Sequence, residues 1–69
     1  EFRRVLFRSE NTIVIIDFKT DAIFLANELM TRYREQLLLY QKAMQMLYPN
    51  SNIACYIYSL HLSEMIQVS

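Results

Sequence analysis

Residue types that usually stabilise a small protein or equip it for chemistry are scarce in this sequence. It contains no glycine, and only one cysteine, one histidine and one proline occur among its 69 residues. A lone Cys55 excludes an internal disulfide, and Cys55 with the distant His61 does not make the ligand set of a zinc site. No apolar run approaches the roughly 20 residues of a membrane-spanning helix, so no membrane contact is expected. A chain of this length forms at most one small domain with little margin of stability.

The first nine residues, EFRRVLFRS, differ in character from the rest. They resemble the translation of a sequencing-library adapter, and we expect residues 1–9 to be non-native and residues 10–69 to be the protein itself. Arg3, Arg4 and Arg8 supply three of the seven positive charges. Without them, four Lys and Arg face six Asp and Glu, a formal charge of −2. Residues 10–69 therefore lack the basic patch that dominates nucleic-acid affinity.

A strand followed by a long helix is predicted by the hydrophobic pattern. Residues 12–18 are rich in Ile and Val and apolar on both faces, as in a strand covered on both sides. Residues 5–7 can pair with this strand as a hairpin. From Asn27, taken as the N-cap, apolar residues recur every three or four positions, which predicts a helix over 27–48. The loop at 49–52, which begins with proline, ends it.

The second half of the chain completes a strand, helix and strand unit. Residues 53–60 are β-branched and aromatic and predict a second strand. Residues 64–68 predict a short edge strand after a turn near His61, which is expected in the loop. Residues 22–26, capped by Asp21, are expected to be a connector. Two strands joined by a helix normally lie parallel in one sheet.

An acid and a base stand at the end of the first apolar run. Asp17 and Lys19 are two residues apart, so their side chains share one face of the strand while Phe18 points to the other. Two interpretations are open. The pair is either a solvated strand end with a bland salt bridge, or a metal-binding carboxylate beside an ammonium that handles a phosphate or a water.

The amide Gln36 interrupts the apolar stripe of the predicted helix. An unpartnered amide on a buried face costs about 1 to 3 kcal/mol, so a partner is expected. Gln36 and Tyr40 are four residues apart and share a helical face. They either bond a loop carbonyl and reach the rim, or both extend toward whatever Asp17 and Lys19 face. The stripe consists of Leu29, Tyr33, Gln36, Leu37, Tyr40, Met44 and Leu47.

Together these motifs resemble the C-terminal nuclease domain of the RecB type, within the PD-(D/E)xK nucleases. The motif Asp-x-Lys lies in VIIDFKTD and Gln-x-x-x-Tyr in YREQLLLY, and the resemblance covers essentially all of residues 10–69. It implies an α/β fold, a partial PD-(D/E)xK (restriction-endonuclease-like) core of strand, long helix, strand and short terminal strand. It also implies a fragment of a magnesium-dependent DNA exonuclease domain in an ATP-dependent helicase/nuclease complex of double-strand break repair and recombination. DNA and a second subunit of a heterodimer are the implied partners, in the bacterial cytoplasm.

The resemblance also assigns roles to five residues. Asp17 binds Mg²⁺, with the backbone carbonyl of Phe18 as a further ligand, and Lys19 positions or activates the attacking water. Gln36 and Tyr40 line the active site near the bound strand. Phosphodiester hydrolysis needs a nucleophile at neutral pH and neutralisation of charge on the phosphate, and a hard cation held by carboxylate oxygen and water provides both. A lysine adds a compact positive charge beside it.

Two elements of the family pattern are missing. Members carry Gly-x-x-Asp on the preceding strand, which supplies a second metal carboxylate, and a histidine farther upstream; neither is present. We therefore expect weak Mg²⁺ binding and an inactive fragment. The related iron–sulfur nucleases use four cysteines, which a single Cys55 does not match. Two alternatives stay open: a non-catalytic nuclease-like module for subunit or DNA contact, and a structural fragment whose acid and base pair at the surface.

Overall fold

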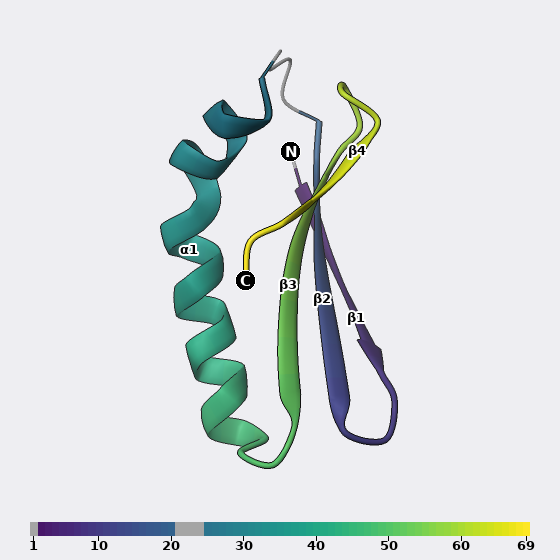
Figure 1. Ribbon diagram of the computed structural model, residues 1–69, viewed down its shortest axis with the longest axis vertical. Coiled ribbons are helices and arrows are strands. Elements are labelled where there is room, and N and C mark those ends of the chain that lie inside the picture. Colours follow the sequence, from purple (N-terminus) through teal and green to yellow (C-terminus); the bar gives the residue numbers. More distant parts are fainter. Residues whose placement is uncertain (1, 21–24) are drawn as a thin grey trace.

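One helix lies against one face of a four-stranded sheet in the computed structural model, which describes residues 2–20 and 25–69 (Figure 1). The strands lie in the order β1-β2-β3-β4. This is a mixed α/β arrangement, and the predicted succession of strand, long helix, strand and short terminal strand is confirmed. The elements are β1 (Phe2–Arg8), β2 (Thr12–Lys19), α1 (Ala26–Leu47), β3 (Asn52–Ser59) and β4 (Glu64–Gln67).

The two central strands are parallel. β2 and β3 pair from Thr12 opposite Asn52 to Lys19 opposite Ser59, as the strand, helix and strand pattern predicts. Parallel neighbours need a long crossover, and α1 supplies it. β1 pairs with β2 antiparallel, which confirms the hairpin, and β4 pairs with β3 antiparallel at the other edge of the sheet.

The core lies between α1 and the facing side of the sheet. Alternate residues of β2 and β3 are buried, because successive strand side chains point to opposite faces. The other face of β2 is only half-buried, so the prediction of a strand covered on both sides is wrong for the described residues, which contain no second layer there. The buried apolar residues are Ile13, Ile15, Leu29, Leu37, Met44, Ile53, Cys55, Ile57 and Val68.

The start of α1 differs from the prediction. The N-cap is Leu25, with φ −126° and ψ 136° and no side-chain capping bond, so Asn27 lies inside the first turn. Its carbonyl accepts a hydrogen bond from Thr31 Oγ1 at 2.9 Å. The prediction of Asn27 as the cap is therefore wrong by two positions, since local cap preference is weaker than the packing that places the helix. The predicted capping role of Asp21 and most of the predicted connector lie outside the described residues.

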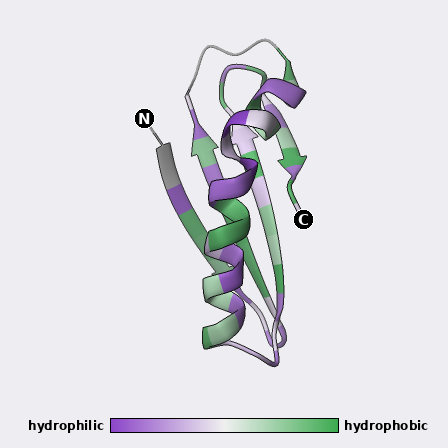
Figure 2. Cartoon of the chain, turned by 90° about the vertical axis from the view of Figure 1, so that its left-hand side faces the viewer, coloured by the Kyte–Doolittle hydropathy of each residue, from purple (hydrophilic) through white to green (hydrophobic). Residues whose placement is uncertain are grey.

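The end of α1 agrees with the prediction. The helix ends at Leu47, and the N–H of Tyr48 donates to the carbonyl of Met44 at 2.9 Å. The outer surface of α1 carries hydrophobic as well as hydrophilic residues (Figure 2). Leu39, Met46 and Leu47 are 68, 78 and 70% exposed there. The predicted place of Leu47 on the buried stripe is therefore wrong, because this residue lies exposed in the last turn.

The absence of glycine has one visible consequence in the backbone. Ser63, in the turn before β4, has a φ of 54°, the only positive φ among the described residues. The left-handed region costs an L-residue roughly 1 kcal/mol more than glycine. His61 lies in this same turn, as predicted. The described part of the chain contains no helix with the length and hydrophobicity of a membrane span.

Candidate functional site

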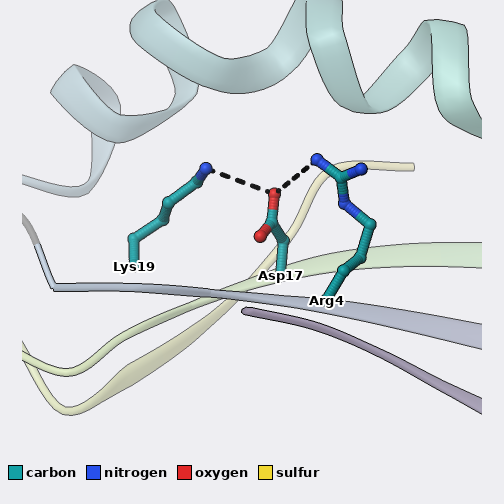
Figure 3. Close-up of polar contacts among 3 residues, drawn as sticks. All are labelled: Arg4, Asp17 and Lys19. Carbon is teal, nitrogen blue, oxygen red and sulfur yellow. Dashed lines mark hydrogen bonds and ion pairs between the residues drawn. The ribbon is translucent and has the colours of Figure 1, made fainter. Parts of the chain in front are cut away.

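Asp17 and Lys19 form a buried ion pair on the face of β2 that α1 covers. Their side chains are 0 and 2% exposed, and Lys19 Nζ lies 3.4 Å from Asp17 Oδ2 (Figure 3). The prediction that they share one face of the strand is confirmed. The interpretation as a solvated strand end, and with it a surface pairing of acid and base, is wrong. Burying two charges costs several kcal/mol per ion, so the pair is a poor device for stability alone.

Arg4 brings a second cation to the same carboxylate. It lies on β1 directly opposite Asp17, and its Nη2 is 3.5 Å from Asp17 Oδ2 (Figure 3). Both cations thus approach one oxygen of Asp17. One carboxylate with two cations leaves the cluster with a formal charge of +1. Arg4 belongs to the nine residues that we expect to be non-native.

Two tyrosines of α1 face these cations. The ring centroid of Tyr33 lies 4.0 Å from Lys19 Nζ, and that of Tyr40 lies 4.6 Å from the guanidinium carbon of Arg4. Tyr33 and Tyr40 are seven residues apart, about two helical turns, and therefore lie on the same side of the helix. The structure thus brings Tyr40 to the Asp17 cluster through Arg4. Tyr33 received no role from the sequence, although its spacing from Tyr40 was the signal that could have found it.

Gln36 is not part of this cluster in the structure. Its side chain is exposed, so the prediction of a buried amide on the apolar stripe is wrong. The residue precedes the fully buried Leu37 by one position, which turns it about 100° around the helix. The amide that joins helix to sheet is Gln41, whose Nε2 donates to the carbonyl of Ile53 at 2.8 Å. Its Oε1 accepts from Ser69 Oγ at 2.6 Å.

The oxygen atoms that could hold a metal ion are few. Asp17 Oδ1 is buried and has no hydrogen-bond partner, and an unpaired buried carboxylate oxygen is a costly group that a cation would satisfy. Phe18, the second predicted ligand, lies inside the sheet with Arg3 and Tyr58 as neighbours. The described residues hold no group of three or more His, Cys, Asp or Glu. Mg²⁺ is usually held by one or two carboxylates plus waters and phosphates, so Asp17 fits as one ligand of an incomplete set.

Ser59 is a buried polar residue that the sequence did not single out. It is the β3 partner of Lys19, is 0% exposed, and its Oγ accepts the N–H of Leu62 at 3.0 Å. Its role in the structure is thus to hold the turn after β3 beside the charged cluster. An open hollow of about 340 Å³ lies elsewhere, against the first turns of α1 between Asn27 and Arg32.

Cys55 is chemically quiet. Its side chain is 0% exposed, and burial raises the pKa of the thiol above its ordinary 9.0, against smaller lowering effects of Ser69 and Arg4. Because the thiolate is the reactive form, the prediction of a buried, inert thiol agrees with this environment.

Similar proteins point in one direction. The chain is 41% identical over 56 residues, or 81% of its length, to the ATP-dependent helicase/nuclease protein AddA of Streptococcus pneumoniae strain Hungary19A-6. The same identity relates it to the exonuclease/helicase subunit RexA of strain TIGR4. It is 36% identical over 66 residues, or 93% of its length, to AddA of Lachnoclostridium phytofermentans. The chain spans only 5% of these relatives. No family model and no solved structure matches it.

Proposed function

The chain is homologous to a segment of the ATP-dependent helicase/nuclease proteins named AddA or RexA, and from that relationship we propose that it is part of a magnesium-dependent DNA exonuclease domain. The domain would have the PD-(D/E)xK core that the motifs of residues 10–69 resemble. The whole protein would act on DNA ends in double-strand break repair and recombination, in the bacterial cytoplasm, together with a second helicase/nuclease subunit.

The buried Asp17 carboxylate is the observation that supports the proposal most directly. Its Oδ1 has no hydrogen-bond partner while its Oδ2 faces Lys19 at 3.4 Å. An acid that is buried, charged and half satisfied is more typical of a site than of a core. In this site a bound Mg²⁺ would supply charge neutralisation and a more acidic water.

Each residue of the chain would then have a distinct task. Asp17 would hold the cation through Oδ1, with the carbonyl of Phe18 as the second candidate ligand. Lys19 would hold a water or a phosphate oxygen with its ammonium. Tyr40, on the side of α1 that faces the cluster, would donate its hydroxyl to the substrate. Gln36, exposed and one turn before Tyr40, would contact the DNA backbone from the rim.

The 69-residue chain itself would be a poor nuclease. Asp17 is the only carboxylate that the described residues place at the site, and Arg4 lies where it would oppose a divalent cation. Like charges 4 Å apart repel by about 4 kcal/mol at an effective dielectric constant of 20. We propose that residues 1–9 are not native, in which case the native preceding strand would carry a different side chain at this place. Reading the source gene upstream of residue 10 tests that point directly.

Substitutions in the full-length protein test the nuclease assignment. Asp17→Ala and Lys19→Ala should each abolish Mg²⁺-dependent DNA cleavage while ATP hydrolysis stays at the level of the unmodified protein. Glu28→Ala and Lys42→Ala remove the same two charge types from α1, away from the ion pair, and are the matched controls. Unchanged cleavage by the Asp17→Ala protein would refute the assignment.

A non-catalytic contact module is the alternative. The exposed apolar side chains of Leu39 and Met46 on α1 favour it, because large exposed apolar groups often mark interfaces. In that case Asp17→Ala would leave cleavage intact, and Leu39→Ser with Met46→Ser would weaken association of the two subunits in sedimentation or pull-down measurements.

A further inference from the structure

Lys19 has an aromatic ring as well as a carboxylate among its neighbours. Its ammonium lies 3.4 Å from Asp17 Oδ2 and 4.0 Å from the ring centroid of Tyr33, with the side chain 2% exposed. The two contacts differ in kind. The carboxylate attracts the ammonium by its full charge, whereas the ring attracts it through the negative face of its π system. Strand β2 and helix α1 thus each contribute one attractive group.

We propose that Tyr33 is a positioning residue for the nuclease site, and that its ring holds the Lys19 ammonium in place beside Asp17. This inference rests on the function proposed above. A lysine side chain has a flexible four-carbon stem and loses much rotamer freedom when held in one place. A ring 4.0 Å away limits that freedom from the helix side, where the carboxylate of β2 has no reach.

The ring has an advantage over a second acid in this position. An aromatic face is neutral, so it attracts the ammonium without adding a charge to the site. It also leaves the oxygens of Asp17 unshared, and Asp17 Oδ1 keeps its lack of a partner. A group that holds lysine without occupying the carboxylate suits a site in which that carboxylate must bind something else.

The contact is independent of the nine N-terminal residues. Tyr33, Lys19 and Asp17 all lie within residues 10–69, whereas the matching contact of Tyr40 is to Arg4. If residues 1–9 are not native, the Tyr40 contact disappears from the native protein and the Tyr33 contact stays. The structure therefore separates the two tyrosines, with Tyr33 turned to the lysine and Tyr40 left for the substrate.

The test uses the full-length helicase/nuclease and measures kcat and KM for DNA cleavage separately. Tyr33→Leu removes the aromatic face and should lower kcat about tenfold, within the range expected for a desolvated cation–π contact. KM for DNA should change less than about twofold, because Tyr33 holds the lysine and not the substrate. Tyr33→Phe keeps the ring and should restore kcat to within about twofold of the unmodified protein.

A control variant and a second apolar variant keep the test decisive. Tyr48→Leu removes a half-buried tyrosine at the other end of α1, where its ring faces Arg8, and should leave kcat unchanged. ATP hydrolysis and the thermal melt report on folding. If Tyr33→Leu melts early, Tyr33→Met replaces it, since an unbranched side chain fills irregular space.

The outcomes separate this inference from the proposed function. Loss of cleavage in Asp17→Ala with a normal kcat in Tyr33→Leu would overturn the positioning role and leave the nuclease assignment standing. A rise of KM at constant kcat would also overturn it, by making Tyr33 a DNA contact. Equal loss in Tyr33→Phe and Tyr33→Leu would assign the effect to the hydroxyl and refute the role of the ring. Normal cleavage in Asp17→Ala would instead refute the proposed function.

Discussion

Replacing Lys19 alone should destabilise the chain far more than replacing Lys19 together with Asp17. In Lys19→Met the buried carboxylate of Asp17 keeps only Arg4, at 3.5 Å and with a side chain 25% exposed. Removing one partner of a buried ion pair costs about 3 to 5 kcal/mol, because it leaves an uncompensated charge. Since Arg4 compensates in part, we expect about 3 kcal/mol.

That loss is comparable with the whole stability of so small a chain. A single core below 70 to 80 residues rarely supplies more than about 3 to 5 kcal/mol. With an m-value of about 1 kcal/mol/M in urea, the midpoint of unfolding should fall by about 3 M. In the double variant Asp17→Leu, Lys19→Met the apolar pair should restore stability to within about 1 kcal/mol of the unmodified chain, since Arg4 can then turn to solvent.

Urea titration followed by circular dichroism measures this, as the chain has no tryptophan. Lys42→Met, on the exposed side of α1, is the matched control and should shift the midpoint by less than about 0.5 M. A midpoint for Lys19→Met equal to that of the control would refute the reasoning. So would a double variant no more stable than the single one, because the cost would then not arise from an unpaired charge.

Further predictions concern residues outside the ion pair. Burial raises the pKa of the Cys55 thiol, so the unfolded chain loses this proton first and stability should fall as pH rises above 9; in urea titrations Cys55→Ala should lose less stability over that range. Gln41→Ala should lower the free energy of unfolding by about 1 to 2 kcal/mol because it removes the bond to a β3 carbonyl, whereas Gln36→Ala, at an exposed position, should leave it within about 0.5 kcal/mol. Ser63→Gly should raise the melting temperature, because glycine adopts the φ of 54° without strain. The purified 69-residue chain should show no Mg²⁺-dependent DNA cleavage, and robust cleavage would contradict the view that one carboxylate is too few.

Strand and helix types were predictable because each follows from a local period. The alternation of Ile13, Ile15 and Asp17 along one face of β2 and the three-to-four spacing of Leu29, Leu37 and Met44 on α1 are properties of neighbours in the chain. The same-face relation of Asp17 and Lys19 needed nothing more. These predictions are confirmed because the backbone geometry of a strand or a helix is the same in every fold.

Predictions that depended on a helix's exact rotation were less accurate. Gln36 and Gln41 are both polar residues near the apolar stripe, and the sequence favoured the first as the buried one. The structure exposes Gln36 and bonds Gln41 to β3. A rotation of a few tens of degrees decides between them, and only the packing of α1 on the sheet sets that rotation.

The sequence by itself determined the order of the elements, their faces and the presence of an acid and a base on one side of β2, since these follow from residues close together in the chain. Tertiary structure decided that this pair is buried, that Arg4 approaches it from β1, and that Tyr33 and Tyr40 face the two cations. Burial and ring contacts depend on which elements pack together, and residues on separate elements become neighbours only when the chain folds.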